Sequence, residues 1–194
     1  MKKDHIIDAA IGLAEESSWE QLSLAELANQ LDSGLDDLSQ VFRSKDDIAE
    51  AFFDRVDQAM LKAAKTVTGD EPERLEKIIF NWFEALAPNK TVVREMLGYK
   101  LEPGHIHLQA HGITRISRTV QWFLTAANCH STGLKRVLLE SAITAAYLTS
   151  FATFLFDSSK NHQQTKKRLN KLITLCYPPC HVIKQRQQKP LAPD

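Results

Sequence analysis

Three histidines, His105, His107 and His111, are the group of residues best suited by type to bind a metal. His107 and His111 stand four residues apart, which places both imidazoles on one face of a helix, where they could share a metal ion. No HExxH glutamate lies between them, and no third ligand is evident in the sequence. We therefore interpret these histidines as solvated or pocket-lining polar residues and expect no metal site.

Two arginines follow on the same stretch of chain. Arg115 and Arg118 could meet the acidic head group of a ligand, since guanidinium groups pair well with carboxylates and phosphates. The sequence contains no nucleophile elbow, P-loop, dinucleotide-binding glycine motif or paired-carboxylate arrangement. We therefore predict a protein that binds rather than catalyses: not an enzyme, and without a cofactor.

The cysteines and the hydropathy pattern indicate a cytoplasmic protein. Cys129, Cys176 and Cys180 are odd in number and lack CxxC spacing, which is typical of reduced thiols. Charged residues within positions 2–8 interrupt any signal-peptide core. The longest apolar-rich stretch, 142–156, has 15 residues. A membrane span needs about 20, so this stretch is interpreted as a buried helix.

The elements that carry these residues are predicted to be helices. Only seven glycines and seven prolines occur in 194 residues, which favours long helices over many short strands. Apolar residues recur at steps of three and four, and no strand pattern is evident. The spacing predicts a first helix ending near Glu16 and further helices over 24–31, 35–42, 45–66, 72–86, 90–100, 105–128, 134–156 and 162–175. The predicted fold class is therefore all-α.

Three S-x-x-D/E sequences mark where short helices begin. They start at Ser23, Ser33 and Ser44. In such a capping box the serine oxygen accepts a hydrogen bond from a free amide of the first helical turn, and the acid reaches back. Since 32–34 joins two helices of only about eight residues, the pattern predicts a helix-turn-helix.

The stretch 22–48 resembles the helix-turn-helix signature of the TetR family of transcriptional regulators. An aromatic residue, Trp19, stands where the family usually has one. The residues that match without a gap are Ser23, Leu24, Leu27, Ala28, Leu38, Phe42, Ser44, Lys45 and Ile48.

The resemblance implies an architecture and a set of partners. It implies a helix-turn-helix head of the DNA-binding type over 1–50 and a helical ligand-binding and dimerisation domain over 51–177. The polar, proline-bearing residues 178–194 are predicted to form a loose tail. The expected partners are operator DNA, a small apolar ligand and a second copy bound through the last two long helices.

The residues expected to face DNA follow from their positions in the head. The second short helix would lie in the major groove with its first side chains at the base edges. In the family, the lysine that matches Lys45 holds a phosphate together with amides at the start of the next helix. The expected DNA-binding residues are Ser23, Asp36, Asp37, Ser39, Gln40 and Lys45.

The charge of the head departs from the family pattern. Residues 1–50 carry four basic and twelve acidic side chains, a net charge of −8, which the remaining residues balance with +8. Phosphate attraction supplies most of the non-specific affinity of DNA-binding proteins. The family's turn glycine is Asp32, and its usual lysine is Leu35. Carboxylates in first helical turns also stabilise helices, and a carboxylate can accept a hydrogen bond from cytosine.

The C-terminal part offers candidate ligand-binding residues. The segment 134–156 is apolar nearly all round and must be buried on most faces. The dimer interface that the resemblance implies would bury it. Aromatic and polar side chains elsewhere could line an apolar pocket, although core packing explains any single aromatic equally well. The candidates are Trp82, Phe83, Tyr99, His111, Arg115, Trp122 and Tyr147.

Two functions are compatible with these patterns. The first is a ligand-responsive transcriptional regulator, a repressor, which binds DNA as a homodimer. The second is a lipid- or quinone-binding accessory protein on the same fold that has lost DNA binding. An acidic head suits the second function, and the basic C-terminal part suits an anionic membrane surface.

Overall fold

The computed structural model describes residues 2–101 and 106–177, without the side chains of residues 101 and 106–111. Regular secondary structure in these ranges is entirely helical, which confirms the all-α fold class. The helices are α1 (Lys3–Glu16), α2 (Leu24–Gln30), α3 (Leu35–Ser39), α4 (Lys45–Ala64), α5 (Glu71–Leu86), α6 (Lys90–Leu101), α7 (Ile106–Ala126), α8 (Gly133–Phe156) and α9 (Gln163–Cys176), with short 3-10 turns η1 (Ala87–Asn89) and η2 (Lys160–His162). The tail over 178–194 lies outside the described residues.

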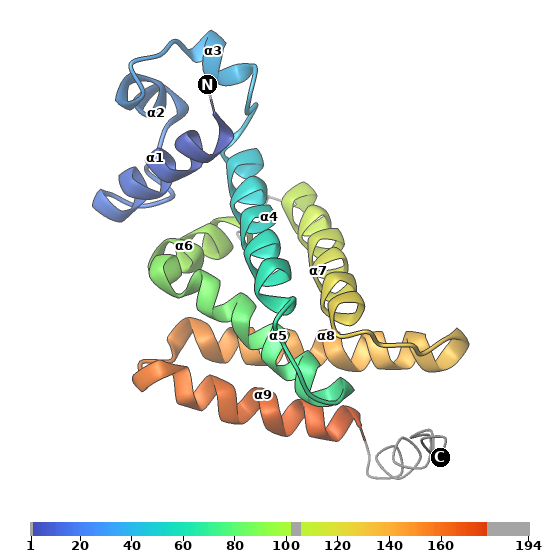
Figure 1. Cartoon of the computed structure of the whole chain (residues 1–194). Coiled ribbons are helices and arrows are strands. Elements are labelled where there is room, and N and C mark those ends of the chain that lie inside the picture. Colours follow the sequence, from blue (N-terminus) through green and yellow to red (C-terminus); the bar gives the residue numbers. More distant parts are fainter. Residues whose placement is uncertain (1, 102–105, 178–194) are drawn as a thin grey trace, which may run out of the picture.

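Helices α1, α2 and α3 form a small head at one end of the molecule, and α4 runs from it into the body (Figure 1). The head is held together by apolar side chains on the facing turns of its helices. Leu27, Leu38 and Ile48 are almost fully buried there. Helices α2 and α3 pack against each other across a short turn, which confirms the predicted helix-turn-helix.

At two of the three predicted capping boxes the serine caps the start of its helix. Ser23 Oγ accepts from the Glu26 amide at 3.1 Å, and Ser44 Oγ accepts from the Asp47 amide at 3.1 Å. The box predicted at Ser33 was wrong, because Gly34 is the residue that precedes α3. The Ser33 hydroxyl instead donates to the Asp37 carboxylate at 3.4 Å. Helix α3 also ends at Ser39 instead of continuing to residue 42.

The turn between α2 and α3 has a left-handed backbone at the position where the resemblance predicts glycine. Asp32, which occupies that position, has a φ of 48°. Side chains other than glycine rarely adopt this left-handed region, although aspartate and asparagine tolerate it best. The turn therefore keeps its shape while the head gains a negative charge.

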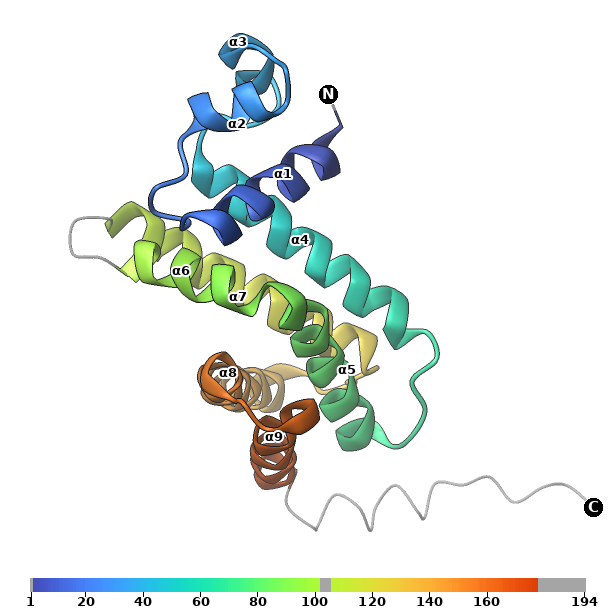
Figure 2. The same cartoon turned by 90° about the vertical axis from the view of Figure 1, so that its left-hand side faces the viewer.

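The body is built around α5. This helix contacts α4, α7, α8 and α9, and Figure 2 shows it at the centre of the bundle. Its buried face carries large aromatic and aliphatic side chains, since its apolar residues recur at helical spacing. They are Leu75, Ile78, Ile79, Phe80, Trp82, Phe83 and Leu86.

Helix α8 (Gly133–Phe156) has its predicted bounds within one residue but is more exposed than the sequence indicates. Within the described residues it is the one helix long and apolar enough, by length and composition, to cross a membrane. A core helix of a globular protein passes the same test, and α8 packs against α7 and α9. Its first half leaves several large apolar side chains exposed: Leu134, Val137 and Leu138.

The turn from α8 to α9 is organised by one buried carboxylate. Asp157 accepts from the backbone amide and hydroxyl of Thr165 at 2.8 and 2.7 Å, and from those of Ser159 at 2.8 and 2.6 Å. Burial alone would raise the pKa of Asp157, but these four hydrogen bonds outweigh it and hold the pKa well below its ordinary value. The carboxylate is therefore ionised in the folded protein.

We expect Asp157→Asn to destabilise the protein by about 2 kcal/mol at neutral pH, because an amide nitrogen would face donors. The native pKa is lowered, so this contribution is complete above about pH 5 and is lost as the carboxylate of the unfolded chain becomes protonated below about pH 4. Urea unfolding of wild type and variant across pH 3–7 measures the difference. The matched control is Asp70→Asn at the exposed cap of α5, which should cost less than 1 kcal/mol. A difference that does not change with pH would contradict the expectation.

Candidate functional site

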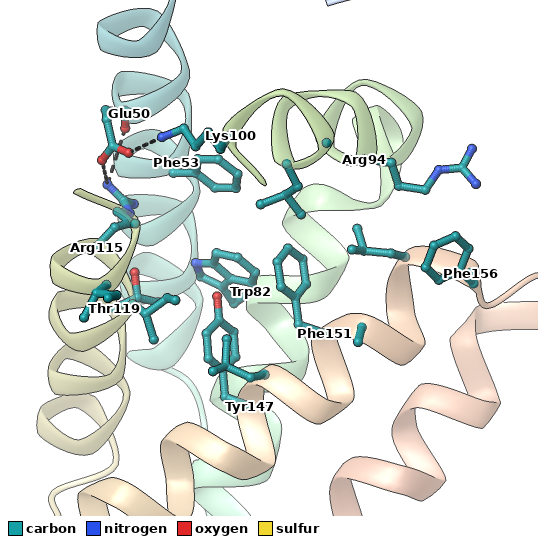
Figure 3. A pocket seen from close by; sticks show the side chains of 18 residues that line it. Glu50, Phe53, Trp82, Arg94, Lys100, Arg115, Thr119, Tyr147, Phe151 and Phe156 are labelled. Atoms are coloured by element: carbon teal, nitrogen blue, oxygen red, sulfur yellow. Dashed lines mark hydrogen bonds and ion pairs between the residues drawn. The ribbon is translucent and has the colours of Figure 1, made fainter. Parts of the chain in front are cut away.

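A cavity of about 680 Å³ opens between α4, α5, α6, α7 and α8 (Figure 3). Its volume lies within the range of ligand-binding pockets in proteins. The walls are mostly apolar, with aromatic rings from three different helices. Phe53 comes from α4, Trp82 from α5, and Tyr147 and Phe151 from α8. Such a lining favours a ligand with a large apolar portion.

The aromatic wall is a packed cluster rather than a set of isolated rings. Trp82 lies edge-on to Tyr147 and Phe151, with ring centroids 5.4 Å apart in each pair, and stacks on Phe53 at 6.3 Å. Phe83 stacks on Tyr147 and Phe151 from behind. Because each ring packs against the next, moving one ring would displace its neighbours.

A buried carboxylate fixes the central ring of this wall. Asp57 of α4 accepts from Trp82 Nε1 at 2.7 Å and from the Thr119 hydroxyl of α7 at 3.2 Å. Arg115 Nη2 completes the set, 2.8 Å from the other carboxylate oxygen. Burial raises the pKa of Asp57, whereas the charge of Arg115 and the hydrogen bonds from Trp82 and Thr119 lower it. The carboxylate thus joins α4, α5 and α7 at one point.

The cations at the inner end of the cavity are already paired. Arg115 bonds to Asp54 as well as Asp57, and Arg118 lies 3.0 Å from Asp54. Lys100 of α6 lies 2.7 Å from both Glu50 and Asp46 of α4. Figure 3 shows Glu50 between Lys100 and Arg115. The charges that the sequence suggested for an acidic ligand therefore serve to tie α4 to α6 and α7.

The cavity brings together some of the predicted ligand-binding residues. Trp82, Arg115 and Tyr147 line it. The other predicted residues that the structure describes, Phe83, Tyr99 and Trp122, lie outside it. Phe83 is fully buried behind the wall, Tyr99 lies beneath the head, and Trp122 is 43% exposed. The side chain of His111 lies outside the described part of the chain, as does that of His107.

Two glycines in the wall were not anticipated. Gly98 of α6 and Gly112 of α7 both line the cavity, and a Cβ added at either position would meet nothing within 4 Å. Glycine inside a helix costs about 1 kcal/mol relative to alanine. An interior glycine in a helical pattern is thus a sequence signal for a packing or functional requirement. Here both glycines leave the cavity open.

The predicted DNA-facing residues lie mostly on the surface of the head. The second short helix exposes Asp36, Asp37 and Ser39, and Gln40 follows them in the next turn. Ser23 is also exposed, although its hydroxyl caps α2. The surface of α3 is therefore acidic, as the sequence indicates.

Lys45 is committed to contacts within the protein. Its Nζ donates to the carbonyl oxygens of Trp19 and Glu20 at 3.1 and 2.9 Å and lies 5.0 Å from the ring centroid of Tyr99. Burial lowers the pKa of Lys45, and the charge of Glu20 opposes that shift. The lysine thus joins the head to α6.

Helix α6 has one face toward the cavity and another toward the head. Leu97 and Gly98 line the cavity, whereas Glu95 accepts a hydrogen bond from the Trp19 amide at 2.7 Å. Tyr99 supports Lys45 on the head side. A shift of α6 would therefore be felt at both places.

Neither the models of protein families nor the curated proteins give a match to this sequence. Solved structures do give matches. The chain is 37% identical to a TetR transcriptional regulator from Nitrosomonas europaea, with a TM-score of 0.78 over 90% of this chain and 97% of that one.

The protein belongs to the TetR family. Two more distant solved structures share the fold. They are a TetR regulator from Rhodococcus sp. RHA1 (16% identity, TM-score 0.69, 90% of this chain and 94% of that one) and FadR from Bacillus subtilis in complex with stearoyl-CoA (18% identity, TM-score 0.62, 89% and 98%). Membership confirms the resemblance found in 22–48. The solved structures that this chain resembles are transcriptional regulators.

We expect the two arginines that contact Asp54 to differ sharply in their effect on stability. Arg115→Met removes a buried cation and leaves Asp57 without its charged partner, which should lower the free energy of unfolding by about 3–5 kcal/mol. Arg118 is half-exposed, so Arg118→Met should cost less than about 1 kcal/mol. Urea unfolding at neutral pH compares them. Equal losses would show that Asp57 does not depend on Arg115.

Proposed function

We propose that this TetR-family protein is a ligand-responsive repressor located in the cytoplasm, which binds operator DNA as a homodimer. The observation that carries this proposal is the double role of α6. One face of the helix lines the apolar cavity, and the other holds the head through Glu95 and Tyr99.

The ligand is proposed to change DNA binding through the linked positions of α6 and the head, and not through direct contact with DNA. A ligand that fits the cavity better in one position of α6 shifts the protein toward that position, by no more than its difference in affinity for the two states. Glu95 bonds to the Trp19 amide, and Lys100 to Asp46 in the first turn of α4. The head is thereby expected to move with α6, and the distance between the two heads of a dimer changes.

The exposed apolar face of α8 and α9 supports the homodimer. Leu134, Val137, Leu138 and Leu175 are between 59% and 75% exposed. Several large apolar side chains exposed on neighbouring helices are typical of an interaction site in a globular protein. A second copy of the same helices would cover it with matching residues about a twofold axis.

The acidic head predicts an unusual form of DNA binding. Few cations are available for phosphates, since Lys45 is bonded within the protein and Arg43 is one of four basic residues in 1–50. Affinity would then depend on contacts with base edges, where Asp36 or Asp37 can accept from cytosine. Such binding is weak on random DNA and less sensitive to salt than that of basic heads.

The first test is selection of fragmented genomic DNA by the purified protein, followed by titration of the recovered fragment across salt. We expect saturable, sequence-selective binding, with a slope of log K against log salt of about −2 to −4, corresponding to only two to four phosphate contacts per dimer. The variant Asp36→Asn with Asp37→Asn should bind random DNA more tightly and discriminate less. The control Asp32→Asn removes one negative charge from the turn that precedes α3. Absence of selective binding by both the apo and the ligand-bound protein would rule out the repressor.

The acidic α3 and the commitment of Lys45 also favour a second function: a lipid- or quinone-binding accessory protein that has lost DNA binding. The apolar cavity suits such a role, and the basic C-terminal part suits an anionic membrane surface. The two functions predict opposite results in the DNA selection.

Filling the cavity should separate ligand response from DNA binding. In Gly98→Leu the new side chain enters the open space beside the Gly98 Cα, and replacing a helical glycine favours the helix. We expect unchanged or higher thermal stability, unchanged affinity for the operator and loss of the ligand's effect on it. Gly12→Leu in α1 is the matched control, because it adds a side chain in open space away from the cavity. A variant that still responds to ligand would show that the cavity is not the effector site.

A further inference from the structure

We propose that the ligand of this cavity is an amphipathic anion, an apolar chain whose charged head group is held by Arg94 at the mouth. This inference rests on the ligand-binding role proposed above and adds the class of ligand and its orientation. The shared chemistry is that of a single-chain carboxylate or phosphate.

Arg94 differs from the other cations of the lining in having no acidic partner. Lys100 and Arg115 are each paired with two or more carboxylates of α4. Arg94 is exposed and forms no ion pair with any residue that the structure describes. Its charge is therefore available to a ligand.

The position of Arg94 suits a head group that remains near the solvent. Figure 3 shows Arg94 and Phe156 together at one side of the cavity, away from Glu50 and Arg115. The guanidinium carbon lies 5.9 Å from the centroid of the Phe156 ring, which is 76% exposed. The ring both orients the guanidinium and extends the apolar wall outward. A chain leaving the cavity would pass Phe156 before its head group reaches Arg94.

The opposite orientation, with the head group inside, is disfavoured by charge. The inner end carries four carboxylates of α4 and three cations, so it has no surplus of positive charge. Arg115 Nε is buried and has no hydrogen-bond partner among the described residues, yet Asp54 and Asp57 contact the same guanidinium. An anion there would be repelled by both. The aromatic wall between the two ends accepts the apolar chain.

Calorimetric titration of the purified, delipidated full chain tests the inference. The probes share one chain length and differ in head group: dodecanoate, dodecyl phosphate and dodecanol. We expect the anions to bind about fivefold more tightly than the alcohol, either both of them or only the one whose head group matches the natural ligand. The difference is modest because the contact with Arg94 is partly exposed. The stronger anion identifies the source as a carboxylate or a phosphate. The preference should shrink as salt rises.

Variants of Arg94 locate the preference. Arg94→Ala should bind the anions only as tightly as dodecanol, without changing the affinity for dodecanol, and Arg94→Lys should restore most of the difference. Arg168→Ala removes an equally exposed arginine on α9, outside the lining, and should behave as wild type. Because Arg94 is exposed, these variants are expected to fold normally.

The other outcomes are decisive. Equal binding of anion and alcohol, or an anion preference that survives Arg94→Ala, would overturn the head-group assignment while leaving the cavity as a ligand site. If none of the three probes binds, and Gly98→Leu responds to ligand in operator binding as the wild type does, both the assignment and the ligand-dependent part of the proposed function are overturned.

Discussion

The buried pair of Asp57 and Arg115 is the interaction on which the cavity depends. A carboxylate that is 4% exposed is costly to keep unless its hydrogen-bonding capacity is filled. Here Trp82, Thr119 and Arg115 fill it, and they come from two helices other than the one that carries Asp57. The same contacts fix the indole against which Phe53, Tyr147 and Phe151 pack. The shape of the apolar wall is thus determined by a polar contact behind it.

The inner ion pairs extend this constraint toward the head. Asp46, Glu50, Asp54 and Asp57 recur along one face of α4 at steps of three and four, so they meet cations from α6 and α7 in succession. The first of them lies one residue after the start of α4, beside Lys45. A continuous row of charges therefore leads from the cavity wall to the point where the head is attached. Packed ion pairs of this kind have discrete arrangements, which suits a switch better than gradual deformation does.

Local features of the sequence were sufficient for most of the fold. Helix limits were predicted within a few residues because caps, prolines and helical spacing act over one or two turns. Ser33 shows where local evidence fails: Asp32 adopts a positive φ, so the chain turns one residue later and Gly34 precedes the helix. The capping pattern alone contains no information about that turn.

The candidate site was less accessible from the sequence. Tyr99 and Tyr147 are both tyrosines within helices, yet one supports the head and the other lines the cavity, because helix packing decides which face turns inward. Arg115 was expected to be free for a ligand, and the carboxylates that pair with it lie about sixty positions earlier in the chain. Ion pairs between residues so far apart in the chain cannot be recognised from the local sequence. Gly98 could have been recognised from the sequence as a candidate site residue, because it is an interior helical glycine that no turn requires.

The charge of the head acquires a structural explanation that is independent of DNA. Among the twelve acidic residues of 1–50, Asp46 and Glu50 are paired with Lys100 in the body, and Asp47 caps the Arg43 amide. These carboxylates are neutralised or used as caps, so the net charge of −8 overstates the field near α3. On α3, the helix proposed to face DNA, Asp36 and Asp37 are both exposed, and Glu20, Glu26 and Asp32 are exposed elsewhere in the head. Under the proposed function, the two carboxylates of α3 stand at the base-reading positions, where a carboxylate either repels phosphate or selects cytosine.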